Sequence, residues 1–234
     1  MWMKIIFHGH SFVEIVDYRG CVLIDPFVSG NPQCDVRFED VIGKNIQAII
    51  LTHGHDDHLG DTVDIVEVVW CPVIVSYELW QYLVHKKWLT DVSCHGCWWF
   101  VSYDHFDVKL FQAWHGWGVG DMWHGFTCVA SGVILSTWGK VIYHAGDTWL
   151  FGDMKLLGEL YAIDVAFLPI GDRFTMWPQD ASIATSWIKP KIVVPVHYNT
   201  WAPIAVDVDD FAQWVRTRCA TKVEVMRAGD VLSL

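Results

Sequence analysis

The sequence predicts an α/β protein with two similar halves, each a sheet covered by helices. Short unbroken apolar runs, such as residues 48–51 and 165–168, are typical of strands buried on both faces. Helix-like segments follow several of these runs, and glycine turns separate them. The order of hairpin strands and then strand–helix units occurs twice. No linker or low-complexity segment interrupts the 234 residues, so we predict one domain over residues 1–234, although the length alone allows two.

The predicted elements can be placed in chain order. Strand patterns cover residues 3–8, 12–17, 21–25, 46–52 and 72–76, and then 106–112, 132–137, 140–144, 163–169, 191–196 and 222–226. Helix patterns cover residues 61–69, 77–86, 153–161, 178–188 and 207–219. Asp61 and Asp207 are suited to cap the first and last of these helices, and Pro190 ends the fourth.

Composition and charge exclude several classes of protein. A hydrophobic content of 53% with 18% charged residues is too apolar for a disordered chain. No apolar run approaches the roughly 20 residues of a membrane-spanning helix, and no signal peptide is visible, so we expect a cytoplasmic protein. The net charge of −11 disfavours binding to nucleic acid. The expected partner is therefore a small-molecule substrate.

The seven cysteines are scattered and odd in number. Without an export signal, we expect reduced thiols. Cys94 and Cys97 form a lone C-x-x-C pair. Because a second pair is missing, a buried or turn-region pair is the simpler interpretation than a structural zinc site.

The most informative segment is residues 53–58, His-Gly-His-Asp-Asp-His, which follows a predicted buried strand and precedes a helix. Imidazoles and carboxylates are the ligands that suit zinc and similar divalent ions. His53 and His55 are two residues apart, so on an extended segment both side chains point the same way. Asp57 and His58 follow at the helix start and can serve a neighbouring ion. The segment predicts a metal centre, with a solvated polar turn as the alternative.

This segment matches the H-x-H-x-D-H signature of the metallo-β-lactamase superfamily, and the chain resembles that superfamily from end to end. The similar motifs are Ile24-Asp25-Pro26, Trp114-His115-Gly116, His144-Ala145-Gly146-Asp147-Thr148 and Pro195-Val196-His197-Tyr198-Asn199. More narrowly, Gly9-His10-Ser11 and residues 25–27 and 167–172 resemble a subgroup of small metal-dependent hydrolases. That subgroup is related to ascorbate-6-phosphate lactonase.

The resemblance implies a four-layer αββα sandwich with the metal ligands on loops at one edge of the sheets. It assigns His53, His55 and His115 to one metal, Asp57, His58 and His197 to a second, and Asp147 to a bridge between them. A hydroxide between the ions is then the nucleophile, because a divalent cation lowers the pKa of bound water towards about 7. The expected cofactors are two divalent ions, zinc first, with manganese, iron or nickel as alternatives.

Residues beside the ligands have expected roles. Asp57 can also orient the hydroxide or shuttle its proton. Tyr198 and Asn199 can donate to a developing oxyanion, with a loop hydrogen bond as the alternative. Asp25 is a buried carboxylate that needs partners, so we expect it to orient a ligand imidazole or the metal loop.

Two further side chains are candidates for the same site. His10 lies at a predicted hairpin and is either an extra ligand, a hydrogen-bond donor or an ordinary turn histidine. Arg173 follows a predicted buried strand and is a candidate for holding an anionic group of the substrate.

The predicted function is a metal-dependent hydrolase acting on a small ester, lactone or phosphodiester. A metal-binding but catalytically silent sensing or interface protein is the main alternative. A di-iron oxidoreductase is a weaker one, because related oxidoreductases usually carry H-x-E-x-D-H, with a carboxylate where this chain has His55.

Tryptophan is over-represented, with 15 in 234 residues. Trp117, Trp149 and Trp177 stand near the predicted metal centre, where relatives usually carry small residues. Small-to-large changes in a packed region cost about 1–3 kcal/mol, so we expect these side chains to face a pocket mouth or an interface of a homo-oligomer. We predict that at least two of the three line the entrance to the metal site.

Overall fold

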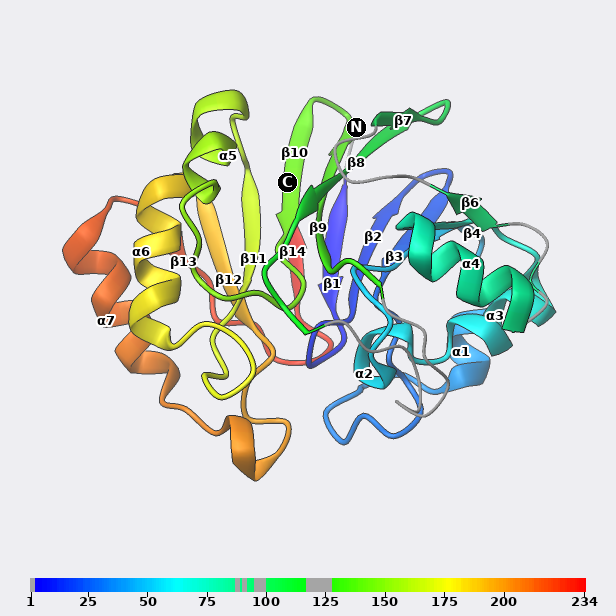
Figure 1. Ribbon diagram of the computed structural model, residues 1–234, viewed down its shortest axis with the longest axis horizontal. Coiled ribbons are helices and arrows are strands. Elements are labelled where there is room, and N and C mark those ends of the chain that lie inside the picture. The colour runs from blue at the N-terminus through cyan, green and yellow to red at the C-terminus, as the bar shows by residue number, and fades with distance from the viewer. Residues whose placement is uncertain (1–2, 87–88, 90–91, 95–99, 117–127) are drawn as a thin grey trace.

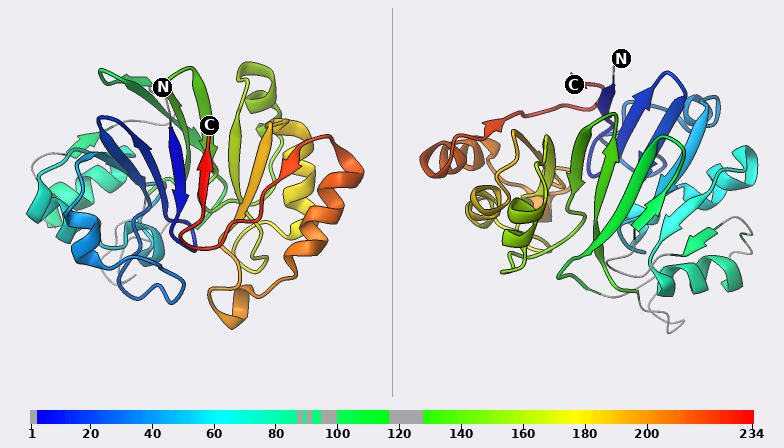
Figure 2. Two further views of the ribbon diagram at one scale, coloured as in Figure 1. Left: turned by 180° about the vertical axis from the view of Figure 1, so that it is seen from behind. Right: turned by 90° about the horizontal axis from the view of Figure 1, so that it is seen from above.

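The computed structural model describes residues 3–86, 89, 92–94, 100–116 and 128–234. Two seven-stranded sheets face each other, and helices cover the outer face of each (Figure 1). The view from above shows the four layers in succession (Figure 2). The predicted αββα sandwich is therefore confirmed.

The first sheet has the strand order β14-β1-β2-β3-β4-β5-β6. Strands β14 to β3 pair antiparallel, and β3 to β6 pair parallel. Its strands are β1 (Lys4–Phe7), β2 (Val13–Asp17), β3 (Gly20–Ile24), β4 (Ile46–Ile50), β5 (Val73–Val75), β6 (Val92–Cys94) and β14 (Val231–Ser233). The helices on its outer side are α1 (Phe38–Ile42), α2 (Asp56–Leu59), α3 (Thr62–Val69) and α4 (Tyr77–Lys86).

The second sheet has the order β13-β12-β11-β10-β9-β8-β7. Strands β7 to β10 pair antiparallel, and β10 to β13 pair parallel. Its strands are β7 (Phe100–Ser102), β8 (Phe106–Gln112), β9 (Ser131–Thr137), β10 (Lys140–His144), β11 (Val165–Pro169), β12 (Ile192–Val196) and β13 (Lys222–Val223). Its outer helices are α5 (Met154–Leu160), α6 (Pro178–Ile188) and α7 (Val208–Arg218), and the short 3₁₀ helix η2 (Ala202–Ile204) precedes α7.

The central core lies between the two sheets. Ile24 and Ile50 of the first sheet pack in one cluster with Val133 and Phe167 of the second, all without solvent exposure. Alternate residues of the same strands face outward and pack under the helices, as Ile49 and Ala166 do. Both faces of each sheet are thus buried, which explains the unbroken apolar runs.

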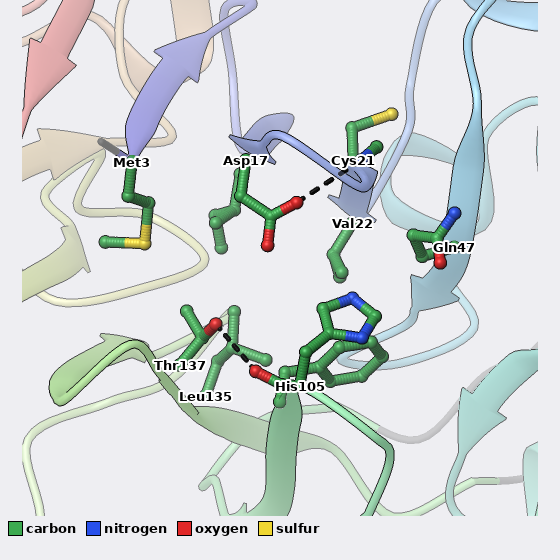
Figure 3. A pocket seen from close by; sticks show the side chains of 11 residues that line it. Met3, Asp17, Cys21, Val22, Gln47, His105, Leu135 and Thr137 are labelled. Atoms are coloured by element: carbon green, nitrogen blue, oxygen red, sulfur yellow. Dashed lines mark hydrogen bonds between the residues drawn. The ribbon is translucent and has the colours of Figure 1, made fainter. Parts of the chain in front are cut away.

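Hairpin turns from both sheets meet at the edge opposite the carboxyl ends of the parallel strands (Figure 3). The Asp17 carboxylate accepts a hydrogen bond from the Trp138 indole at 2.7 Å. In Figure 3, the Thr137 hydroxyl donates to the His105 carbonyl, at 2.9 Å. The cavity drawn there has a volume of about 10 Å³, close to the minimum for one water molecule. It is too small for a substrate.

Most predicted elements are present, and a few predictions were wrong. Helices α4 and α6 and strands β8 and β10 have the predicted bounds. The structure adds α1, α2, β6, β7 and β14, which the sequence patterns did not indicate. None of the helices in the described ranges is long and apolar enough to cross a bilayer. The five cysteines whose state is described, Cys21, Cys34, Cys71, Cys128 and Cys219, are free thiols, whereas Cys97 and the Cys94 side chain lie outside the described residues.

Asp61 stands at the start of α3 as predicted, but its carboxylate does not cap that helix. It accepts hydrogen bonds from the backbone N–H groups of Val28 and Ser29, both at 2.8 Å. The buried Asp61 side chain therefore fixes the backbone of the loop that begins after β3 with Asp25.

Replacing Asp61 with alanine should lower the free energy of unfolding by about 1–3 kcal/mol, because two backbone donors lose a buried acceptor. Urea unfolding checks this. The control is Asp64→Ala, an exposed residue of the same helix, and an equal effect of both substitutions would contradict this role for Asp61.

Candidate metal centre

Histidine and aspartate side chains from five separate loops meet at one edge of the sandwich. The loops follow β1, β4, β8, β10 and β12. Their potential ligand atoms form two groups, each within 4.8 Å. We call them site A, with His53, His55, His115 and Asp147, and site B, with His10, Asp57, His58 and His197. The structure thus brings together all seven residues expected to bind metal, and adds His10.

In site A, three imidazole nitrogens converge. His53 Nε2 lies 2.9 Å from His55 Nδ1, which lies 3.2 Å from His115 Nε2. His115 Nε2 is also 3.4 Å from Asp147 Oδ2. A tetrahedral zinc ion with Zn–N distances of about 2.0–2.1 Å holds its ligand atoms roughly 3.3 Å apart. The spacing in site A therefore fits such an ion.

Burial lowers the pKa of His53, His55 and His115. These imidazoles are therefore neutral and keep a lone pair for a metal. The other ring nitrogen of His53 has a partner as well, because Nδ1 lies 3.0 Å from the Thr52 hydroxyl. That contact leaves Nε2 as the atom that faces site A.

In site B, His58 is oriented by Asp25. The Nδ1–H of His58 donates to Asp25 Oδ2 at 2.7 Å, and both side chains are fully buried. The same carboxylate accepts from the Thr52 hydroxyl at 2.7 Å and from the Thr52 backbone N–H at 2.8 Å. Asp25 therefore fixes the His58 tautomer with the Nε2 lone pair towards the site, as a group behind a metal ligand does.

The His10 ring contacts Asp57 on one side and Thr200 on the other. Burial and the neighbouring His197 lower the pKa of His10 to about 4, so its ring is neutral. Nε2–H then donates to Asp57 Oδ2 at 3.1 Å, and Nδ1 accepts from the Thr200 hydroxyl at 2.8 Å. This arrangement favours the hydrogen-bond donor among the roles considered for His10.

Asp147 lies between the two sites. Its Oδ1 is 3.2 Å from His58 Nε2, and its Oδ2 is 3.1 Å from His197 Nε2 and 3.4 Å from His115 Nε2. Asp147 Oδ1, His58 Nε2 and His197 Nε2 are nevertheless buried without a hydrogen bond of acceptable geometry. Buried polar atoms normally have hydrogen-bond partners. These three atoms converge without bonding one another, which is the arrangement expected of ligands that share a metal ion.

The charge distribution of the centre favours cations. Burial alone would lower the pKa of His197, but the Asp147 and Asp57 carboxylates outweigh it and raise the pKa to about 9. In His58 the same balance raises the pKa well above its usual value. The carboxylates therefore stabilise positive charge at this edge of the sandwich. A bound divalent ion supplies more of that charge than a single proton does.

The backbone at the site is unusual. His10, Asp25 and His197 all have positive φ, at 56°, 49° and 54°, a region that non-glycine residues seldom adopt. The turn before Asp147 uses a glycine, because a Cβ on Gly146 (φ 59°) would lie 2.7 Å from the Thr52 Cβ. The site is thus built from sharp turns that carry functional side chains.

The remaining predicted residues lie around this centre. Asn199 is exposed, and its side-chain oxygen accepts from the Val206 N–H at 2.8 Å, which is the loop hydrogen bond considered above. Tyr198 packs partly against the outer core of the second sheet. Arg173 is exposed in the turn after β11. None of these observations tests a role in catalysis, so those roles stay predictions.

Aromatic side chains are exposed near the site. Trp201 is 38% exposed, and its ring centroid lies 4.8 Å from that of His10. Trp114, Trp149 and Trp177 are exposed on loops that follow β8, β10 and β11. Trp117 lies outside the described residues. Whether these side chains line the entrance stays a prediction.

Sequence reasoning missed several supporting side chains. Thr52 connects Asp25 to His53, and Thr200 and Gln33 hold His10, whose backbone N–H donates to Gln33 Oε1 at 3.3 Å. Thr52 could have been found, since it directly precedes the motif; the others come from distant segments.

Comparison with known proteins identifies the family. The Beta-lactamase superfamily domain matches residues 21–198. A UPF0173 metal-dependent hydrolase of Anoxybacillus flavithermus is 46% identical over 216 residues, 91% of this chain and 93% of that protein. One of Bacillus cereus is 43% identical over 235 residues, 99% of this chain and 100% of that protein.

Solved structures agree with this relationship. Igni18, a metallo hydrolase from the archaeon Ignicoccus hospitalis, has a TM-score of 0.89 at 32% identity, covering 100% of this chain and 99% of its own. An isothiocyanate hydrolase from Delia radicum gut bacteria has a TM-score of 0.77 at 15% identity, with 98% of both chains covered, and shows the fold alone. The chain therefore belongs to the metallo-β-lactamase superfamily and is a metal-dependent hydrolase of the UPF0173 group.

Proposed function

We propose that this chain binds two divalent metal ions, zinc first, at sites A and B, and hydrolyses a small ester, lactone or phosphodiester. The observation that carries the proposal is the convergence of buried nitrogen and oxygen atoms that do not bond one another. His53, His55 and His115 would hold one ion, Asp57, His58 and His197 the other, and Asp147 both. Such ions polarise the substrate oxygen and lower the pKa of bound water.

The residues of the chain have distinct tasks in this proposal. Asp57 is the most accessible of the site carboxylates, with 26% of its side chain exposed against 3% for Asp147 and none for Asp25. Burial raises the pKa of Asp57, but the His58 charge, the hydrogen bond from His10 and the nearby His197, 3.6 Å away, together lower it, so Asp57 is a carboxylate. As the site carboxylate nearest to solvent, Asp57 would accept a hydrogen bond from an attacking water and orient it.

Elemental analysis of the purified protein, followed by a substrate screen of the zinc-loaded form, tests the proposal. The substrates are p-nitrophenyl acetate, an aliphatic lactone and bis(p-nitrophenyl) phosphate. We expect two ions per chain and turnover of at least one substrate that is lost in His58→Ala. A protein that binds no divalent ion, or one that binds ions without any turnover, would contradict the proposed hydrolase.

Metal loading should also stabilise the fold, because the ligands come from both sheets. His53, His55, Asp57 and His58 follow β4 of the first sheet, whereas His115, Asp147 and His197 follow strands of the second. A ligand at 100 times its Kd stabilises the native state by about 2.7 kcal/mol. Thermal unfolding with zinc and then with excess EDTA checks this, and an unchanged Tm would contradict ion binding across the sheets.

A further inference from the structure

A cavity of about 250 Å³ opens beside site A. It lies between residues 112–115, which continue β8, and residues 128–130, which lead into β9. The Ala113 N–H donates to the Ala130 carbonyl at 3.0 Å, so the two segments run side by side. The cavity is therefore framed by the segments that leave β8 and enter β9, at the end of the second sheet.

The wall of this cavity is mainly apolar. Ala113, Trp114, Val129 and Ala130 line it together with the Cys128 thiol. Burial raises the pKa of Cys128 to about 11, although a hydrogen bond with the Gly54 backbone opposes the shift. The thiol is therefore neutral, and Gln112 and His115 are the polar members of the wall. No charged carboxylate, lysine or arginine is among the described lining residues.

The cavity adjoins the metal centre through a shared residue, His115. His115 belongs both to its wall and to site A, where it lies 3.4 Å from Asp147. Cys128 contacts the backbone of Gly54, between His53 and His55. The Trp114 backbone is held on both sides, because its N–H donates to the Thr148 hydroxyl at 3.0 Å and its carbonyl accepts from the Trp149 N–H at 2.9 Å.

The size and chemistry of the cavity define what fits. An apolar cavity of about 150 Å³ accepts benzene, so about 250 Å³ is enough for an aryl group or a short alkyl chain. Placing a charged group there would bring it against apolar side chains, without a partner of opposite charge among the described lining residues. The occupant is therefore an uncharged apolar group attached to the reacting centre.

We propose that this cavity is an apolar subsite for the acyl chain of a carboxylic ester, with the ester carbonyl at the metal centre. The inference rests on the proposed function and narrows its substrate class to esters with a short apolar acyl group. In the reaction, water adds to the carbonyl carbon and the bond to the alkoxy oxygen breaks. The alcohol leaves with one proton, and the acid keeps the apolar chain in the cavity.

The zinc-loaded protein can be tested with p-nitrophenyl esters of acetate, butyrate, hexanoate and decanoate. Burying one methylene is worth about a fourfold change in kcat/KM. We expect kcat/KM to rise by roughly tenfold or more from acetate to butyrate, to rise again to hexanoate, and to stop rising once the cavity is full. A flat or falling series from acetate to hexanoate would overturn the subsite.

The variant Val129→Asp tests the cavity wall directly. Val129 lines the cavity and is 40% exposed, so an aspartate at this position can reach water. We expect it to reduce the hexanoate-to-acetate ratio of kcat/KM by roughly tenfold or more, because the charge must be desolvated when the chain binds. Val129→Thr, of similar shape, should reduce the ratio less. The matched control is Val225→Asp, a valine of 42% exposure near β13, which should leave the ratio unchanged.

Calorimetric binding of hexanoate and acetate separates this inference from the proposed function. Both anions share the carboxylate, so tighter binding of hexanoate that is lost in Val129→Asp reports the cavity alone. That result without any ester turnover would support the subsite and reject the proposed ester hydrolysis. Ester turnover without chain preference, and with equal binding of the two anions, would reject the subsite and leave the hydrolase intact.

Discussion

Replacing Asp147 with asparagine is expected to lower kcat/KM for any substrate of this enzyme by roughly a thousandfold or more. Asp147 is the one carboxylate of the described centre that approaches imidazoles of both sites, at 3.1–3.4 Å. An amide presents one acceptor and no charge, so it cannot neutralise two ions, and metal-ion catalysis supplies several kcal/mol. Steady-state kinetics together with elemental analysis checks this.

The control for Asp147→Asn is Asp153→Asn, at an exposed position six residues later. It should keep both the metal content and the activity. Circular dichroism should show the same fold for both variants. If Asp147→Asn retains two ions per chain and more than a tenth of the activity, Asp147 does not bridge the ions.

Replacing Asp25 with asparagine is expected to weaken metal binding at site B by about 10- to 100-fold. The Asp25 carboxylate accepts from His58 Nδ1–H and from Thr52, all at 2.7–2.8 Å. An amide can turn its NH₂ group towards His58, which then loses the tautomer that leaves Nε2 unprotonated. The side chain lies behind the ligand, so this effect is one of orientation.

Competition with a chromophoric chelator measures that affinity for each ion in turn. Site A should keep its Kd, since Asp25 reaches His53 only through Thr52. The matched control is Asp56→Asn, within the same motif but exposed to solvent, which should leave both constants unchanged. If both variants lose the same affinity, the cause is the loss of a negative charge near the site and not the orientation of His58 by Asp25.

Local patterns identified the elements that end at clear signals. Pro178 begins α6 and a left-handed Lys189 before Pro190 ends it, so its predicted bounds were correct. β14 was missed because its three residues pair with β1, more than 220 positions away, and no local pattern marks such an edge strand. Strand β13 ends at Val223, short of the predicted residue 226, and Met226 packs in the central core.

The metal centre was more predictable than its surroundings. Imidazoles and carboxylates clustered on strand ends carry a distinctive chemical signal, and the structure brings the predicted set together. Thr200 and Gln33 carry no such signal, because their roles arise only where the loops after β12 and β3 meet the turn after β1. Asp61 was assigned to the wrong partners because an aspartate before a helix most often serves that helix.

The left-handed backbone of His10, Asp25 and His197 imposes two selection pressures at the same positions. Glycine would relieve the backbone at each of them, but it would remove the imidazole or carboxylate. Branched residues would strain the turn even in an inactive protein. A population of sequences selected for stability alone should therefore drift towards glycine at these three positions, whereas one selected for activity should retain residues that the fold itself does not prefer.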